Sequence, residues 1–345
     1  MTELKIYLRK TGGILQQAQI NLRLQRIVTI VAVVLFIIKI IAWYITKSVS
    51  ILTDALESTV NVFAGFISLY SLYIAAKPRD SNHPYGHGKA EFLSAAVEGS
   101  LIFIAGIVII YQVIYNFLYP HELQKLDYGI LLVAITAIIN FITGRYCVSV
   151  GKRNNSLALI ASGKHLQSDT WSTLGIIVGL IVIWLTKLKW LDGTIAIGLS
   201  VYIMYTGYAI VRSSIAGIMD EADRKLLQKM VQLLDQNRRI NWIDLHNLRI
   251  IKFGNVLHTD CHLTVPWYLN VRQAHEEIEI LSSLVRKEFG ETVEFFVHAD
   301  GCFDFSCKIC NKQDCTVRKF PFEKRIKWTV DNISRNTRHD ISTGE

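Results

Sequence analysis

The chain has 345 residues, is 51% hydrophobic, and carries 37 Lys and Arg against 29 Asp and Glu, for a net charge of +8. Its mean hydropathy of +0.29 and the long apolar blocks in its sequence exclude an ordinary soluble protein and favour membrane spans. Basic loops that face anionic lipid account for the positive charge, so no nucleic-acid partner is expected.

Six blocks of roughly 20 or more mostly apolar residues follow one another along the chain, each long enough to cross a bilayer. They cover residues 26–46, 51–76, 92–118, 127–150, 157–186 and 190–218. Residues 1–25 lack an apolar core with a cleavage site and are interpreted as a cytosolic N-terminal segment. Lys and Arg concentrate before the first block, in alternate connections and after the last block. Both termini of this multi-pass protein are therefore expected in the cytoplasm, with the blocks in the inner (plasma) membrane.

The predicted six-helix transmembrane domain, residues 26–220, is followed by a small soluble domain at residues 221–300. RKLLQKMVQLLDQNRR has helical periodicity, HNLRIIKF and NVLHTDCHLTV alternate as strands, VRQAHEEIEILSSLVRKEFG is helical, and TVEFFVHAD is a strand. This order predicts an α+β fold with helices on one face of a sheet. Residues 301–345 form a basic, Cys-containing tail that is expected to be loosely ordered at its end.

Two polar pairs interrupt the apolar blocks at helical spacing. His165 and Asp169, in KHLQSDTW of the fifth block, are four residues apart and share one helix face. Glu57 and Asn61, in ILTDALESTVN of the second block, have the same spacing, and Asp54 lies one turn before them. A rise of about 1.5 Å per residue places both pairs near the middle of the membrane. A His nitrogen and side-chain oxygens converging there predict a four-coordinate site for a divalent cation.

The alternative is that each polar residue bonds only to a neighbouring helix and holds the bundle together. Two pairs at the same spacing favour the metal site over that alternative. Lys39 in the first block and Glu98 in the third block are expected to pair with each other and to be structural.

A second cluster lies in RDSNHPYGHGKAEF, in the cytosolic connection between the second and third blocks. Asp80, His83 and His87 fall within eight residues, and Gly86 and Gly88 allow the backbone to turn tightly. These residue types predict a metal site. The alternative is a solvated loop with incidental histidines.

The soluble domain holds a third cluster. Strand alternation brings candidate ligands to common faces, namely His258, Asp260 and His262 on one strand and His298 and Asp300 on a later one. With His246 and His275 nearby, metal binding is favoured over chance.

The tail contains four of the six cysteines, Cys302, Cys307, Cys310 and Cys315, in the pattern C-x4-C-x2-C-x4-C. Disulfides are not expected on the reducing side of the membrane. Four thiolates at this spacing suit a tetrahedral zinc ion that would staple the tail. Metal sensing and a group of unligated thiols are the alternatives.

Three of these motifs together resemble the cation diffusion facilitator family: HPYGHGKAE in the loop, HLQSD in the fifth block and VHADGC at the end of the soluble domain. The resemblance covers about residues 25 to 300. It implies six transmembrane helices followed by a cytosolic ferredoxin-like, metallochaperone-like domain. It also implies a homodimer that exchanges cytosolic divalent metal for protons by alternating access.

The resemblance assigns roles to individual residues. It implies transport-site ligands at Glu57, Asn61, His165 and Asp169, a loop site at Asp80, His83 and His87, and cytosolic sites that join two soluble domains at His246, His262, His275, His298 and Asp300. It further implies a salt bridge between Lys89 and Asp220 that holds the transmembrane halves together.

The chain departs from many bacterial zinc exporters of that family, which have Asp at both second-block positions. Glu57 and Asn61 leave two formal negative charges in the site instead of three, unless Asp54 supplies the missing carboxylate. An amide oxygen is a weaker zinc ligand than a carboxylate. Zinc is therefore the first expectation, with manganese, iron, cobalt or cadmium as alternatives.

Two other functional classes are alternatives to a secondary active transporter. A membrane metalloenzyme lacks support, because the sequence contains no HExxH pattern and no nucleophile with a placed base, so no enzyme is expected. A metal-responsive sensor or scaffold without transport is the remaining alternative. Divalent metal is expected as substrate and as structural ion, and no organic cofactor is expected.

Overall fold

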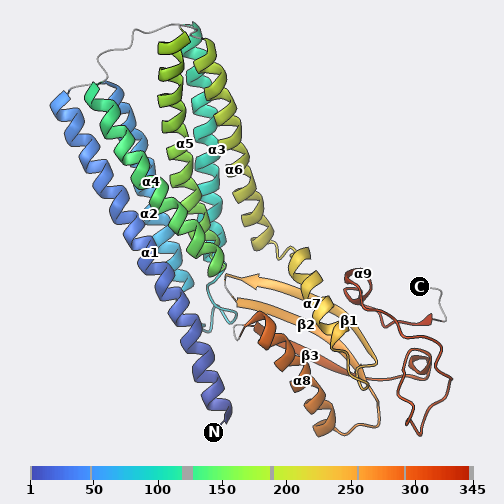
Figure 1. Ribbon diagram of the computed structural model, residues 1–345. Coiled ribbons are helices and arrows are strands. Elements are labelled where there is room, and N and C mark those ends of the chain that lie inside the picture. The colour runs from blue at the N-terminus through green and yellow to red at the C-terminus, as the bar shows by residue number, and fades with distance from the viewer. Residues whose placement is uncertain are drawn as a thin grey trace. The chain divides into compact units, whose positions relative to one another are not determined.

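The computed structural model describes residues 2–46, 49–118, 127–186, 190–254, 256–290 and 293–341 (Figure 1). The chain divides into two compact units, Ile14–Met219 and a second unit that combines Met1–Gly13 with Asp220–Glu345. The first is the helical unit, and the second contains the sheet.

Six long helices lie in the predicted transmembrane region of the described chain (Figure 1). They are α1 (Thr2–Thr46), α2 (Val49–Ala75), α3 (Ala90–Leu118), α4 (Asp127–Arg153), α5 (Leu157–Thr186) and α6 (Trp190–Ile218). α1 is continuous through the predicted boundary between the N-terminal segment and the first block. Among the described residues, two segments, Gln17–Ile41 and Ala90–Tyr115, are long and apolar enough to cross a membrane. The helices by themselves therefore do not establish six spans.

The helical unit has the reverse polarity of a soluble protein. Large apolar side chains such as Ile30 and Tyr111 are exposed, whereas Gln25, Glu98 and His165 are buried. Exposed apolar surface of this kind is unfavourable in water and is readily accommodated by lipid. The burial pattern therefore supports a membrane environment for this unit.

Glycines allow two helix pairs to approach backbone to backbone. A Cβ added at Gly163 of α5 would lie 2.7 Å from the carbonyl oxygen of Gly144 in α4. A Cβ added at Gly207 of α6 would lie 2.7 Å from the carbonyl oxygen of Gly99 in α3. Small residues at such contacts are typical of membrane helices. The first contact fixes the part of α5 that carries the KHLQSDTW motif.

The second unit has the predicted order of elements. These are α7 (Arg224–Gln236), β1 (Asp244–Phe253), β2 (Val256–Val265), α8 (Val271–Phe289) and β3 (Val293–Gly301). β2 is the central strand and pairs antiparallel with β1 and parallel with β3. The Asp223 side chain caps α7 by accepting from the backbone N–H groups of Lys225 and Leu226.

One apolar core joins the helices to one face of the sheet. Leu234 of α7, Leu263 of β2 and Leu281 of α8 are completely buried in it. Alternate residues of β2, including His262, point to the other face. The polar face predicted from strand alternation is thereby separated from the core.

The tail packs against this domain as far as the structure describes it. It contains the 3-10 helix η1 (Asp304–Lys308) and the short helix α9 (Val330–Ile333). Trp328 and Ile333 are buried in the core of the domain, and the Arg238 guanidinium lies 4.2 Å from the Trp328 ring centroid. The tail is thus anchored to the domain, while its last residues, 342–345, lie outside the described structure, so the expectation of a loosely ordered end stays a prediction. The sequence did not indicate this anchoring, because Trp328 and Ile333 are isolated apolar residues in a polar stretch and form no periodic pattern.

Candidate metal centres

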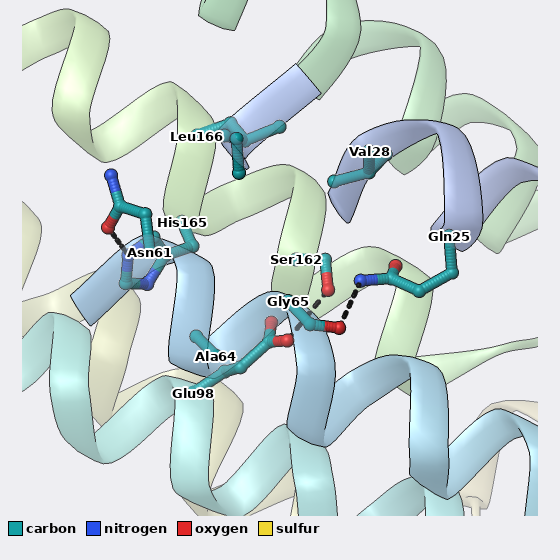
Figure 2. Close-up of a pocket in the computed structure, with 10 residues that line it drawn as sticks. Gln25, Val28, Asn61, Ala64, Gly65, Glu98, Ser162, His165 and Leu166 are labelled. Carbon is teal, nitrogen blue, oxygen red and sulfur yellow. Dashed lines mark hydrogen bonds between the residues drawn. The ribbon is translucent and has the colours of Figure 1, made fainter. Parts of the chain in front are cut away.

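α2 and α5 bring three of the predicted transport-site ligands together inside the helical unit. The Asn61 Oδ1 atom lies 2.6 Å from His165 Nε2 (Figure 2), and Asn61 Nδ2 donates to Asp169 Oδ2 at 2.6 Å. Because the amide nitrogen donates to the carboxylate, Oδ1 accepts, and the imidazole proton lies on Nε2. The side chains of Asp54 and Glu57 lie outside the described part of the structure. We call Asn61, His165 and Asp169 the midhelix site.

Lys39 and Glu98 do not pair as expected. Lys39 Nζ donates to Ser58 Oγ at 2.7 Å. Glu98 on α3 accepts from Ser162 Oγ at 2.7 Å, one turn before His165 on α5. The predicted ion pair was therefore wrong. The sequence indicates how deep each residue lies along its helix, but it does not indicate toward which neighbouring helix the side chain points.

The predicted loop residues lie together between α2 and α3. Asp80, His83 and His87 offer ligand atoms that all lie within 4.8 Å of one another. His83 Nδ1 is 3.1 Å and His87 Nε2 is 3.5 Å from an Asp80 carboxylate oxygen. The backbone N–H of His83 and burial act in opposite directions on the pKa of Asp80, and the net effect lowers it. The carboxylate is thus held in its charged form, which is the form that binds a cation.

Strand register aligns three histidines on the polar face of the sheet. His246, His262 and His298 are neighbours across β1, β2 and β3. Asp300 Oδ2 is 3.2 Å from His262 Nδ1 and 3.5 Å from His246 Nε2, while Oδ1 is 3.2 Å from His298 Nδ1. Ligand atoms of His246, His262 and Asp300 lie within 4.8 Å of one another. We call His246, His262, His298 and Asp300 the sheet cluster.

The environment of the sheet cluster suits cation binding. Burial lowers the pKa of His246, which favours the neutral imidazole that can ligate a metal. Burial raises the pKa of Asp300, but Arg338, His262 and His298 lower it more, so its net pKa is below the usual value. The cluster therefore combines the neutral imidazole of His246 with an ionised carboxylate.

Two other predicted histidines lie outside this cluster. His275 is exposed on α8, and no described contact brings it to the sheet cluster. His258 shares the predicted strand face but is buried and lies 3.2 Å from Glu294, opposite it on β3. Strand alternation predicted the face correctly and could not predict which residues along that face would meet.

The tail covers the sheet cluster in a way that the sequence did not indicate. Arg338 lies 3.0 Å from Asp300 Oδ1 and donates to the Gly301 carbonyl at 3.3 Å. Its neighbour His339 contacts Asp244 through both its backbone N–H, at 3.1 Å, and its ring Nδ1, at 2.5 Å. The Arg338 guanidinium thus contacts Oδ1 of Asp300, whereas His246 lies near Oδ2.

Replacing Arg338 with Gln is expected to tighten zinc binding at the sheet cluster about tenfold, the equivalent of about 1.4 kcal/mol. A cation in the wild type has to share Asp300 with the guanidinium, whose ion pair with this carboxylate is partly buried. Calorimetric titration of the full chain with Zn²⁺, following the binding that His262→Ala removes, measures the change. Lys324→Gln removes the same charge from an exposed tail position and should leave the affinity unchanged. Equal affinity in wild type and Arg338→Gln would show that the two do not compete.

The predicted salt bridge between Lys89 and Asp220 stays a prediction. Lys89 Nζ donates to the Ile218 carbonyl oxygen at 3.4 Å, within the helical unit. Asp220 belongs to the other unit.

The tail cysteines lie near one another without closing into a tight shell. Arg318 donates to the carbonyl oxygens of Cys307 and Cys310 at 2.9 Å each and so holds their loop together. Burial raises the pKa of the Cys302 thiol, and the other three cysteines raise it further. Among the described residues, no three of these thiols form a group within 4.8 Å. The arrangement is a loose set of thiols in one loop.

Comparison with known proteins covers most of the chain. Residues 26–219 match the cation efflux transmembrane domain, and residues 223–302 match the cytoplasmic domain of cation efflux proteins. An uncharacterised transporter of Synechocystis is 32% identical over 248 residues, which are 72% of this chain and 80% of that protein. The cation-efflux pump FieF of Pectobacterium atrosepticum is 28% identical over 279 residues, 79% of this chain and 90% of that protein. FieF of Salmonella typhi is 28% identical over 278 residues, with the same coverage.

Proposed function

The chain belongs to the cation efflux family, and from this premise we propose a secondary active transporter that exports divalent transition-metal cations from the cytoplasm in exchange for protons. The observation that carries the proposal is the midhelix site, where Asn61, His165 and Asp169 meet inside the helical unit. Polar and ionisable side chains among apolar helices are costly to bury, and they commonly mark the pathway of an ion. A sensor needs no ligands at that depth.

The chemistry of His165 supports proton exchange. Its Nε2 atom faces Asn61 Oδ1 and carries the imidazole proton in this arrangement, and the neutral ring can move that proton to Nδ1 when a cation binds Nε2. An imidazolium carries a proton on both nitrogens and cannot ligate the metal, so a second proton and the cation exclude each other. An unperturbed His pKa of about 6.5 allows both states near neutral pH. We infer that protonation from the outer side, with Asp169 as partner, releases the metal.

The proposal extends to the assembly and its membrane. It includes alternating access in a homodimer of the inner membrane. The distribution of Lys and Arg favours a location of both termini in the cytoplasm. The sheet cluster would then bind metal on the cytoplasmic side. Zinc is the first expected substrate, with manganese, iron, cobalt and cadmium as alternatives, because Asn61 contributes an amide oxygen where a carboxylate would favour zinc.

Flux into sealed vesicles tests the proposal. Purified protein in liposomes is expected to move Zn²⁺ when a pH gradient is imposed, and a panel with Mn²⁺, Fe²⁺, Co²⁺ and Cd²⁺ ranks the substrates. Protein-free liposomes under the same gradient are the control. Metal that binds without crossing the bilayer would favour the sensor or scaffold instead. Flux that is indifferent to the gradient would remove proton exchange.

We also propose that Cys302, Cys307, Cys310 and Cys315 hold one structural zinc ion that staples the tail. Their shared loop and the Arg318 contacts to the carbonyl oxygens of Cys307 and Cys310 support this, since four thiolates at this spacing suit a tetrahedral zinc ion. Native mass spectrometry is expected to find one tightly held zinc that the fourfold Cys→Ser variant loses. Equal zinc content in the two proteins would end the proposal.

A further inference from the structure

A small cavity adjoins the midhelix site on the side toward the start of α5. Its volume is about 20 Å³, enough for one water-sized occupant. Its polar lining comes from four helices, with Gln25 on α1, Asn61 on α2, Glu98 on α3, and Ser162 and His165 on α5. Figure 2 shows Glu98, Ser162 and Gln25 gathered at one end and His165 with Asn61 at the other.

Two oxygens of this cavity lack a donor among the described residues. Glu98 is 1% exposed, and its Oε1 accepts from Ser162, but its Oε2 has no hydrogen-bond partner there. Gln25 is completely buried, and its Nε2 donates to the Gly65 carbonyl at 3.4 Å, while its Oε1 has no partner. Buried acceptors are rarely left unsatisfied. Both point to an occupant that offers a positive charge or a donor.

The oxygen atoms that line the cavity narrow the choice of occupant. No described basic side chain forms an ion pair with Glu98, and Lys39 donates to Ser58 instead. Carboxylate, amide and hydroxyl oxygens together are the ligands of a hard divalent cation. The donor set thus differs from that of the midhelix site, which includes a His nitrogen.

We propose that Gln25, Glu98 and Ser162 form a second binding position for a divalent cation, adjoining the midhelix site. Ser162 precedes His165 by one turn of α5, and the start of α5 is the predicted cytosolic end of that helix. An ion arriving from the cytosol meets this position first and then passes to His165 and Asp169. The proposal rests on the transport function. It gives this chain a second substrate site that a cation would occupy before it reaches the midhelix site.

Glu98→Gln tests the second position in the full-length protein. Equilibrium dialysis with Mn²⁺ is expected to find one fewer bound ion per chain than in the wild type. In liposomes, the KM for Mn²⁺ is expected to rise at least about tenfold, with the maximal rate within about twofold, since the midhelix site remains intact. Gln25→Met, which removes the other unsatisfied oxygen, should act in the same direction and serves if Glu98→Gln does not fold.

Glu91→Gln is the matched control. Glu91 is also a buried glutamate of α3, hydrogen-bonded to Ser156, and it does not line the cavity. Its replacement should change neither the ion count nor the KM. An unchanged ion count and KM in Glu98→Gln would overturn the proposal. If only the pH dependence of the flux changed, Glu98 would bind a proton and not the metal, which would also overturn it. If the wild type moved no metal, the transport function would fail while the ion count still tested the second position.

Discussion

Replacing His165 with alanine is expected to lower pH-driven metal flux at least about a hundredfold. The variant loses the one nitrogen donor of the midhelix site and leaves Asn61 Oδ1 without its 2.6 Å partner. Loss of groups that only orient a metal ligand already costs about 10–100-fold in affinity or activity, and loss of the ligand itself should cost more. The initial rate of Zn²⁺ uptake into liposomes, over a series of internal and external pH values, measures the effect.

The pH series distinguishes the two roles of His165. If this residue both binds metal and carries the proton, the small flux left in His165→Ala should no longer depend on the gradient. His121→Ala removes a histidine that belongs to none of the proposed sites and should transport as the wild type does. Full gradient-driven flux in His165→Ala would refute both roles.

Replacing Asn61 with aspartate is expected to shift the Zn²⁺ to Mn²⁺ flux ratio toward zinc by about tenfold, the equivalent of about 1.4 kcal/mol. The change adds a formal negative charge beside His165 and supplies a carboxylate, which is a stronger zinc ligand than an amide. It also replaces the donor that now reaches Asp169 Oδ2 at 2.6 Å. Two carboxylates then face each other, so the empty variant should be less stable than the wild type and should regain stability when zinc is added.

Competition flux with both metals and thermal unfolding with and without zinc measure these effects. Asn61→Ala is the matched variant, because it removes the same contacts without adding charge. It should lose transport of both metals and show no gain for zinc. A zinc preference that was unchanged in Asn61→Asp would show that the second-block residues do not set the choice of metal.

Sequence reasoning predicted the parts of the molecule that periodicity encodes. Alternation gave the strands and their polar face, and helical spacing placed His165 and Asp169 on one face of α5. These features depend on residues a few positions apart. The order of elements in the second unit is likewise local, since each element carries its own pattern.

Features that depend on distant contacts were missed. Nothing near Arg338 indicates that it reaches Asp300, and Glu98 was assigned to Lys39 because a sequence does not give the rotation of a helix about its axis. The cavity has the same origin, since Gln25, Glu98 and Ser162 come from three helices. Such arrangements arise only when the helices pack.

The glycine contact between α4 and α5 has a mechanical consequence. Because the two backbones lie in contact at Gly144 and Gly163, we expect α4 and α5 to move as one unit that carries His165 and Asp169. Asn61 lies on α2, outside that pair. In the alternating access proposed above, movement of α2 against the pair would therefore separate the Asn61 amide from the imidazole and the carboxylate.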